Sequence, residues 1–257
     1  MTMTLPQAII SGAVQGITEF FPISSSGHLV ILHSLFRVNE PQLAFDIFLH
    51  IGTLGSIFIF FWHDIVSLFG KNKRLLLAII IASIPTFIIG FFFKDSIERL
   101  FGMPKVVGWM LIVTGVWLTA ATIYSARSVK RWPNGSPGVI SSLLVGIAQG
   151  IAIIPGISRS GATIATGILA GLSREEAFRF AFLLSIPAVV GASLLKAYKI
   201  GASLAATDAL QFAAGAITAL IVGVVSIKIL LNVVKGNRLY LFGIYCFFAG
   251  IITIILL

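Results

Sequence analysis

Charged residues are scarce in this sequence, since Asp, Glu, Lys and Arg together make up only 11% of its 257 residues. An ordinary soluble domain is about one quarter charged. In their place, 58% of the residues are hydrophobic, and the mean hydropathy is +1.04. The lack of charge excludes water as the main solvent of the fold and predicts an integral membrane protein.

The sequence also has a single cysteine and no basic segment near its N-terminus. Cys246 is the only cysteine, which excludes an intrachain disulfide and a cysteine-based metal site. The first positive charge is Arg37, so we expect no cleavable signal peptide. The net charge of +9 would suggest nucleic acid in a soluble protein, but the basic residues lie in short clusters between apolar runs, as in membrane loops. We therefore expect no nucleic-acid partner.

Apolar runs of near-membrane length recur along the whole chain, and one helical span needs about 20 residues. We expect an all-α fold with six transmembrane helices, of which the fourth is the shortest and weakest. Their ranges are Leu43–Trp62, Leu75–Phe93, Val106–Tyr124, Phe180–Leu195, Ala209–Val234 and Leu239–Leu257.

An internal repeat relates the two halves of the sequence. Residues Gly12–Gly27 align without gaps on Gly146–Gly161, with eight of sixteen positions identical at an offset of 134. The shared Gln-Gly-Ile and Ile-Ser-x-Ser-Gly make chance a poor explanation. Each copy opens a half with three of the six spans, so we predict one membrane domain in two repeats, residues 1–127 and residues 138–257.

Each copy of the repeat has the pattern of a re-entrant helical hairpin. Ala8–Phe21 is apolar but gives about 21 Å of helix, too short for a hydrocarbon core of about 30 Å. A polar break and the short apolar stretch Leu29–Phe36 follow. The second copy has the same plan, with Val139–Ile154, a break at Pro155–Gly161 and Ala162–Leu172. The alternative is a full span, because Ala8–Leu35 is long enough to cross once.

Counting crossings gives the orientation of the halves. With three crossings in each half, the second half is inverted relative to the first, an arrangement found in transporters. Ten basic residues then fall on one face, with Lys228 within reach of it, and six on the other, which places both termini outside. The first set is Lys71, Lys73, Arg74, Arg127, Lys130, Arg131, Arg174, Arg179, Lys235 and Arg238, and the second is Arg37, Lys94, Arg99, Lys105, Lys196 and Lys199.

The first break carries polar groups that are expensive at membrane depth and by default mark function. Glu19 lies four residues after Gln15, so the two share a helical face. The break also contains Ser24, Ser25, Ser26, Gly27 and His28. A helix follows them, and its free N–H groups and dipole favour an anion. Serines at a helix start are equally explained as simple N-caps.

The second break adds a permanent positive charge at Arg159, whose fork geometry suits phosphate. Its neighbours are Ser158, Ser160 and Gly161. Two helix starts, one Arg and several hydroxyls predict a site for a polyanionic head group, of which phosphate is the natural choice. The alternative is a buried Glu19–Arg159 ion pair that only joins the halves. His33, His50 and His63 lack such neighbours, so we interpret them as structural.

These residues resemble the undecaprenyl-diphosphate phosphatase family, membrane phosphatases linked to bacitracin resistance. The pattern Gln-Gly-x-Thr-Glu-Phe-x-Pro-x-Ser-Ser-x-Gly-His at Gln15–His28 is similar to the family's first signature, and Pro155–Thr163 is similar to its second. Further similarity, in Phe45–Gly55, Ser83–Pro85 and Phe182–Pro187, extends the resemblance over nearly the whole chain. The family has Glu or Gln at the first position, so this chain keeps one of two possible carboxylates.

The resemblance implies removal of the terminal phosphate of a polyprenyl (undecaprenyl) diphosphate at the outer face of the cell membrane. The product is the monophosphate carrier lipid for cell-wall polymers, and the cofactor is a divalent cation, Mg²⁺ or Ca²⁺. The catalytic residues it implies are Glu19, Ser25, His28 and Arg159, with Glu19 also as a metal ligand. The phosphate-binding residues it implies are Ser24, Ser158 and Thr163. The two breaks themselves add Gln15, Ser26, Gly27, Ser160 and Gly161 as candidate substrate-binding residues.

Several alternatives stay open from the sequence. Ser25 could attack with Glu19 or His28 as its base, or a water could attack directly. A transporter or lipid-phosphate flippase could use the same mid-membrane anion site, although it needs no nucleophile and base. The expected partners are the lipid substrate and membrane lipids, and a homodimer is one open arrangement.

Overall fold

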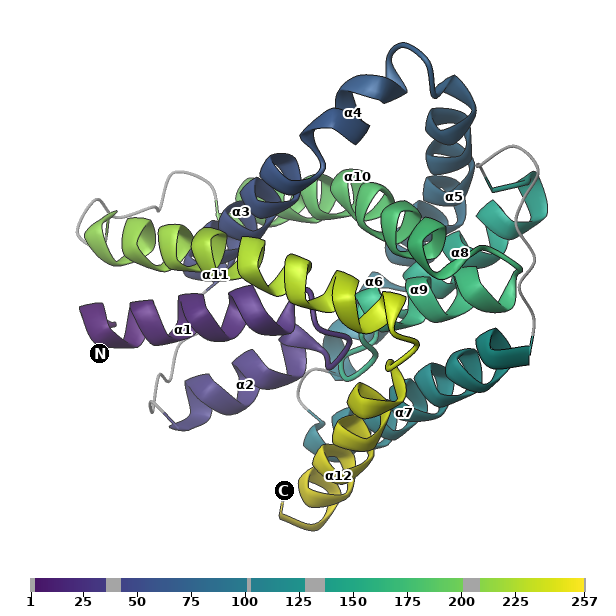
Figure 1. The fold of residues 1–257 in the computed structure, drawn as a ribbon. Helices are drawn as coiled ribbons and strands as arrows, with labels where there is room; N and C mark the ends of the chain where they lie inside the picture. Colours follow the sequence, from purple (N-terminus) through teal and green to yellow (C-terminus); the bar gives the residue numbers. More distant parts are fainter. Residues whose placement is uncertain (1–2, 36–42, 101–102, 128–136, 201–208, 257) are drawn as a thin grey trace.

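The computed structural model describes residues 3–35, 43–100, 103–127, 137–200 and 209–256. Within them the chain forms twelve α-helices and no β-strand (Figure 1). The helices are α1 (Leu5–Thr18), α2 (Ser25–Leu35), α3 (Leu43–Phe60), α4 (Trp62–Leu68), α5 (Lys73–Phe92), α6 (Lys94–Leu100), α7 (Pro104–Arg127), α8 (Val139–Ile151), α9 (Arg159–Leu169), α10 (Arg174–Ile200), α11 (Ala209–Lys235) and α12 (Tyr240–Leu256).

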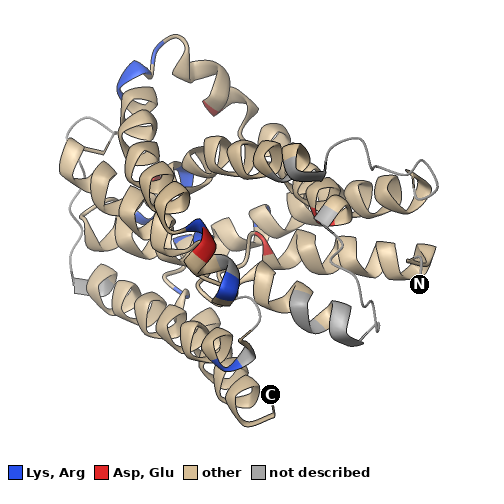
Figure 2. Ribbon diagram, turned by 180° about the vertical axis from the view of Figure 1, so that it is seen from behind, with Lys and Arg blue, Asp and Glu red and all other residues tan. Residues whose placement is uncertain are grey.

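Four of these helices, α5, α7, α10 and α11, are long and apolar enough to cross a membrane. They coincide with four of the six predicted spans. Figure 2 shows long stretches of helix without a charged residue. Their outer faces expose large apolar side chains, such as Phe87 and Phe91 of α5 and Ile221 of α11. A polar solvent would penalise such surfaces, so the chain is a multi-pass membrane protein.

The other two predicted spans differ from expectation. The range Leu43–Trp62 corresponds to α3, and the short helix α4 follows it at an angle of 78°, so the two form a bent pair. The bend lies where the apolar run meets Asp64, which pairs with Arg179 near the start of α10. Leu239–Leu257 is the 17-residue helix α12, about 26 Å long.

The fourth span is longer than its apolar run. It was predicted from Phe180, but α10 begins at Arg174 and has 27 residues. A reciprocal cap starts the helix. The Ser173 N–H donates to the Glu176 carboxylate at 2.9 Å, and the Glu176 N–H donates to Ser173 Oγ at 3.3 Å. This capping box stabilises the charged first turn that precedes the apolar segment.

Each predicted hairpin consists of two short helices around a non-helical break, α1 and α2 in the first copy and α8 and α9 in the second. Both breaks lie a few residues earlier in the chain than predicted, because α1 ends at Thr18 and α8 ends at Ile151. The second helix of each pair begins at Ser25 and at Arg159, so these polar residues form the first helical turn. Ser158 is the N-cap of α9, and its Oγ accepts from the Gly161 N–H at 3.2 Å. This side-chain cap explains the earlier helix start.

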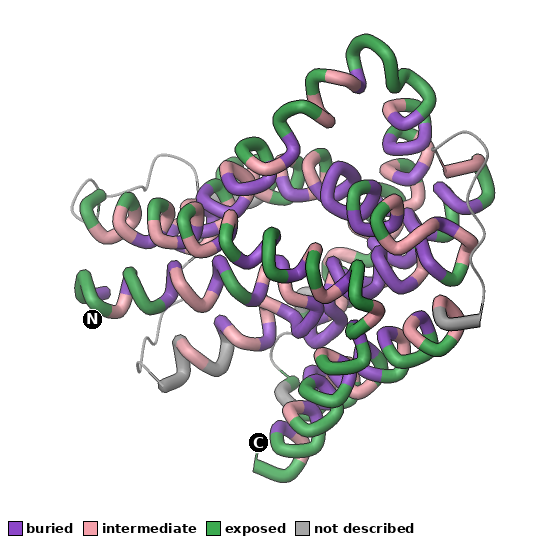
Figure 3. The backbone as a smooth tube through the Cα atoms, viewed as in Figure 1, coloured by how far each residue is buried: buried purple, intermediate pink, exposed green. Residues whose placement is uncertain are grey.

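Each hairpin packs against a long helix from the other half of the chain. α1 lies against α11, and α8 lies against α5. The contacts are so close that a Cβ at Gly12 would overlap the Gly215 carbonyl oxygen, and one at Gly146 would overlap the Ala82 carbonyl oxygen. Small residues allow such close helix packing in membranes. Figure 3 shows buried residues gathered where α8, α9 and α10 meet.

Candidate active site

The Glu19 carboxylate is the centre of the site. It follows the last turn of α1, and its side chain is only 9% exposed. Its Oε2 accepts from Ser25 Oγ at 2.7 Å and from Gln15 Nε2 at 3.2 Å. Its Oε1 lies 3.7 Å from the Arg159 guanidinium. The structure therefore brings together predicted residues from both breaks around one acid.

The two helix starts present equivalent residues to this carboxylate. Ser25 and Arg159 occupy matching positions of the repeat, and each is the first residue of its helix, α2 or α9. The flanking serines pair in the same way. Ser24 Oγ lies 3.3 Å from Ser26 Oγ, and Ser158 Oγ lies 3.1 Å from Ser160 Oγ. Both helix N-termini thus converge on one point, where their dipoles favour negative charge.

The breaks touch each other directly and are held in defined backbone conformations. A Cβ at Gly161 would lie 3.1 Å from Pro22 Cβ, so the second hairpin packs on the first. Ser24 has a φ of 69°, in the left-handed region that side chains other than glycine seldom adopt. Strained residues of this kind cluster at functional sites. In the second break, Thr114 Oγ1 of α7 donates to the Gly156 carbonyl oxygen at 3.2 Å and accepts from the Ser158 N–H at 3.1 Å.

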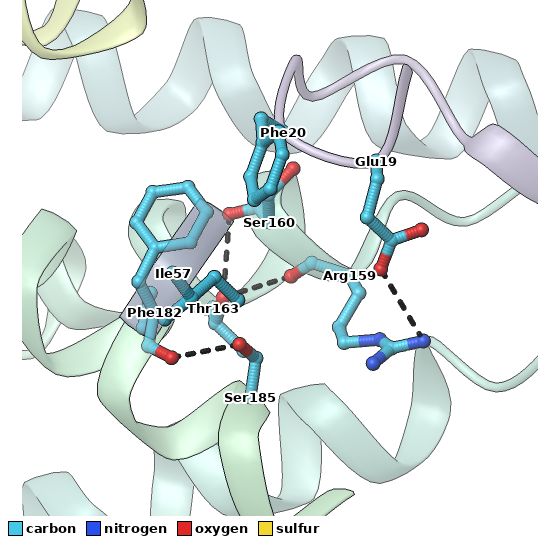
Figure 4. A pocket seen from close by; sticks show the side chains of 9 residues that line it. Glu19, Phe20, Ile57, Arg159, Ser160, Thr163, Phe182 and Ser185 are labelled. Atoms are coloured by element: carbon cyan, nitrogen blue, oxygen red, sulfur yellow. Dashed lines mark hydrogen bonds and ion pairs between the residues drawn. The ribbon is translucent and has the colours of Figure 1, made fainter. Parts of the chain in front are cut away.

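A small pocket adjoins the carboxylate. Figure 4 shows Glu19 and Arg159 facing each other, with Phe20 and Phe182 on the other side. The lining residues are Glu19, Phe20, Ile57, Arg159, Ser160, Thr163, Ala181, Phe182 and Ser185. The pocket is therefore polar and charged on one wall and apolar on the other, a combination that suits a head group attached to a hydrocarbon chain.

The remaining predicted residues mainly hold the two breaks in position in this structure. Thr163 lines the pocket, but its Oγ1 donates to the Arg159 carbonyl oxygen at 2.8 Å. Gly27 allows close packing, since a Cβ there would lie 3.2 Å from Val107 of α7. Gln15 is fully buried and orients Glu19 through its amide nitrogen. These residues stabilise the two breaks around the acid.

His28 lies on α2 and contacts Tyr245 of α12. Its Nδ1 lies 2.8 Å from the Ser24 carbonyl oxygen, and its Nε2 lies 2.6 Å from Tyr245 Oη. The His28 and Tyr245 rings also stack, with centroids 5.8 Å apart. Both ring nitrogens thus have partners other than Ser25 and Glu19.

The interpretation of His50 as a histidine without functional neighbours was wrong. Its Nε2 lies 3.9 Å from Glu19 Oε2, and α3 brings it there from a distant part of the sequence. Ser185 of α10, which no motif singled out, lines the pocket. Two signals were available. Asp46 and His50 share a helical face inside an apolar run, and Ser185 lies in a segment that resembled the family.

The arrangement can perform one kind of chemistry directly. A hydroxyl that donates to a buried carboxylate is a nucleophile beside a base. An arginine and two helix N-termini beside it can neutralise a transferring phosphoryl group. The site therefore fits phosphoryl transfer from a substrate with an apolar tail.

Comparison with known proteins agrees with this chemistry. Residues 8–252 match the family described as bacitracin resistance protein BacA. A protein of Methanosphaera stadtmanae described as undecaprenyl-diphosphatase is 44% identical, over 97% of this chain and 96% of its own. Proteins with the same description from Desulforapulum autotrophicum and Halothermothrix orenii are each 41% identical, over at least 98% of both chains. The chain belongs to the bacitracin resistance protein BacA family, whose curated relatives are undecaprenyl-diphosphatases.

Proposed function

We propose that the protein hydrolyses the terminal phosphate of a polyprenyl diphosphate, undecaprenyl diphosphate being the substrate named for its relatives. The observation that carries this proposal is the 2.7 Å hydrogen bond from Ser25 Oγ to Glu19 Oε2, with Arg159 on the other carboxylate oxygen. A transporter or flippase needs anion-binding groups but no such pair of nucleophile and base. The geometry favours the enzyme.

The contacts support Ser25 as nucleophile and Glu19 as its base. The Ser25 hydroxyl passes its proton to Glu19 Oε2 while its oxygen bonds to the terminal phosphorus. The bond from that phosphorus to the bridging oxygen breaks, and the lipid monophosphate leaves with the bond's electrons. Water then attacks the phosphorus of the phosphoserine, the bond to Ser25 Oγ breaks, and Glu19 returns its proton to that oxygen as phosphate is released. Arg159 and the two helix N-termini neutralise the charge that spreads over the phosphoryl oxygens.

A divalent cation, Mg²⁺ or Ca²⁺, is part of the proposal. Among the described residues, no group of three His, Cys, Asp or Glu side chains could hold a metal ion by itself. Oxygen donors are present, however, because Glu19 lies beside Gln15, whose Oε1 is buried with no hydrogen-bond partner. Mg²⁺ is commonly held by one or two protein oxygens together with substrate phosphates. Glu19 and Gln15 fit such a role, in which the cation neutralises phosphate charge.

The membrane arrangement is also proposed: six spans and two re-entrant hairpins, with the second half inverted relative to the first. Equivalent residues support it, because Gly12 and Gly146 pack on α11 and α5, and these occupy corresponding places in the two halves. Contacts at helix ends support the predicted faces. Arg179 pairs with Asp64, and Lys235 lies 3.8 Å from Glu175.

Substrate selectivity tests the proposed function. Detergent-purified protein should release one phosphate per polyprenyl diphosphate. Without a membrane barrier transport cannot be detected, so this assay distinguishes an enzyme from a transporter. Release from short water-soluble diphosphates should be much slower, since each buried CH₂ adds about 0.8 kcal/mol of binding energy. The measurement is the rate of phosphate release at matched concentrations of the two substrates. Equal efficiency on both substrates would contradict the membrane-cleft assignment.

Labelling of single cysteines tests the orientation, with Cys246 replaced first to give a clean background. We expect Asn72→Cys and Gly236→Cys to react with an impermeant thiol reagent only from the cytoplasm, and Ser96→Cys only from outside. A cysteine near Gly135, which lies outside the described residues, should behave as the one at Asn72. Reaction of the Asn72 and Gly236 sites from opposite faces would contradict the proposed inversion.

A further inference from the structure

Thr114 lies on α7 in the first half of the chain, and its side chain is buried against the second break. The Ser158 N–H donates to its Oγ1 at 3.1 Å. The hydroxyl proton faces two carbonyl oxygens, that of Met110 on α7 at 3.1 Å and that of Gly156 in the break at 3.2 Å. One hydroxyl thus joins a helix of the first half to the break that precedes α9.

The Ser158 N–H depends on this contact. Ser158 is the N-cap of α9, so the helix itself offers its N–H no acceptor. Ser158 is also buried, and within the described part of the chain its N–H donates to Thr114 Oγ1. A buried N–H without an acceptor is costly in free energy, because it loses its hydrogen bond to water and gains none. Loss of the hydroxyl therefore favours a displaced start of α9.

The break also lies directly on α7 at the residue before this turn. Gly156 has a φ of 94°, and a Cβ there would lie 2.4 Å from the Val107 carbonyl oxygen and 2.8 Å from Met110 Cβ. Glycine adopts this conformation without a steric penalty and leaves room for the close approach. Thr114 contacts the backbone on both sides of Ile157, so its hydroxyl holds the break against α7 where the two are closest.

Two parts of the candidate site follow directly after Ser158. Arg159 is the first residue of α9, and its guanidinium lies 3.7 Å from Glu19 Oε1. The N-terminus of α9 is the second part, and Ser158 Oγ caps it by accepting from the Gly161 N–H at 3.2 Å. A shift of Ser158 would move both parts relative to the first break. Small displacements of groups that act on the transition state lower reaction rates strongly.

We propose that Thr114 is a positioning residue of the proposed phosphatase. Its hydroxyl holds Ser158 on α7 and thereby sets where Arg159 and the N-terminus of α9 meet the phosphate. This role rests on the proposed function. Because these groups neutralise the transferring phosphoryl group, loss of the hydroxyl lowers kcat more than it changes KM.

Substitutions of similar size test this role in the full-length, detergent-purified protein with polyprenyl diphosphate. Thr114→Val, which replaces the hydroxyl by a methyl group, should lower kcat by about 10- to 100-fold. Thr114→Ala, which cannot crowd the break, should show a similar loss, whereas Thr114→Ser keeps the hydroxyl and should retain nearly the wild-type rate. Thr122→Val is the matched control and should equal wild type, because the Thr122 hydroxyl donates to the Leu118 carbonyl oxygen of its own helix at 2.9 Å.

Two further measurements separate positioning from a general loss of stability. In an Arg159→Lys background, Thr114→Val should reduce the residual rate by less than about twofold, because coupled residues are not additive. Hydrogen exchange at the Ser158 amide, which requires no turnover, should be faster in Thr114→Val than in wild type and unchanged in Thr114→Ser.

Several outcomes would overturn the role of Thr114 while leaving the phosphatase proposal intact. They are wild-type turnover of Thr114→Val, equal losses in the Val and Ser variants, full additivity with Arg159→Lys, and unchanged exchange at Ser158. A wild type that releases no phosphate would instead overturn the phosphatase proposal and the catalytic consequence of Thr114 with it, and the exchange experiment would still show whether Thr114 holds the break.

Discussion

Glu19→Gln should lower phosphate release from polyprenyl diphosphate by about 100- to 10,000-fold, the usual contribution of a general base. The amide has nearly the shape of the acid, but it cannot accept the proton of Ser25, which donates to Glu19 Oε2 at 2.7 Å. It also lacks the negative charge with which the carboxylate would attract a cation. Turnover by the purified, monodisperse variant across a range of Mg²⁺ and Ca²⁺ concentrations is the measurement.

The control for this experiment is Gln15→Glu, which should retain activity. Gln15 donates to Glu19 at 3.2 Å, so a second carboxylate there would face the first. A divalent cation can bridge the two, and we expect this variant to depend more strongly on cation concentration. An active Glu19→Gln protein would show that the carboxylate is structural, and the base role would then pass to a histidine.

Arg159→Lys should lower turnover by about 100-fold although the positive charge is kept, comparable to losing one donor to the transition state. Arginine presents a planar fork that binds two phosphate oxygens, whereas an ammonium group acts as a point charge. Arg159 is placed so that it can leave Glu19 and bind the phosphate. Its guanidinium is 28% exposed and lies 3.7 Å from Glu19, longer than a direct hydrogen bond. Initial rates at saturating substrate give the comparison.

Arg99→Lys is the matched control for that substitution, because Arg99 is exposed on α6, far along the chain from either break. Its rate should equal that of wild type. If Arg159→Lys also turned over at the wild-type rate, the role of Arg159 would be electrostatic or structural, and bidentate phosphate binding would be wrong.

The helices and the central contacts could be predicted from the sequence because apolar length and repetition determine them. Four spans, two broken hairpins and the meeting of Glu19, Ser25 and Arg159 follow from runs that must leave water and from polar residues that must avoid lipid. The exact helix starts did not follow. They depend on caps, such as the hydrogen bond from the Gly161 N–H to Ser158 Oγ, which make polar residues helical that the sequence alone assigns to a break.

The histidines show that local sequence does not determine which helices pack together. His28 is predicted to be catalytic from its serine neighbours, which stays a prediction, but its contact with Tyr245, 217 residues away in the chain, could not be predicted. His50 was set aside for lack of polar neighbours, yet α3 places it beside Glu19. Both placements result from packing between helices distant in sequence. The local sign of the His50 placement is a pair of polar residues, Asp46 and His50, on one face of an apolar span, where ionisable groups by default mark function.

The close contact of α1 with α11 has a consequence for how the protein is made. α1 leaves the ribosome first, but the surface that Gly12 packs against belongs to Gly215, which is synthesised near the end. The packing of α1 on α11 can therefore form only after most of the chain has been translated. Until then the polar backbone at the first break depends on other partners for shielding from lipid, such as Val107 of α7, which lies against Gly27.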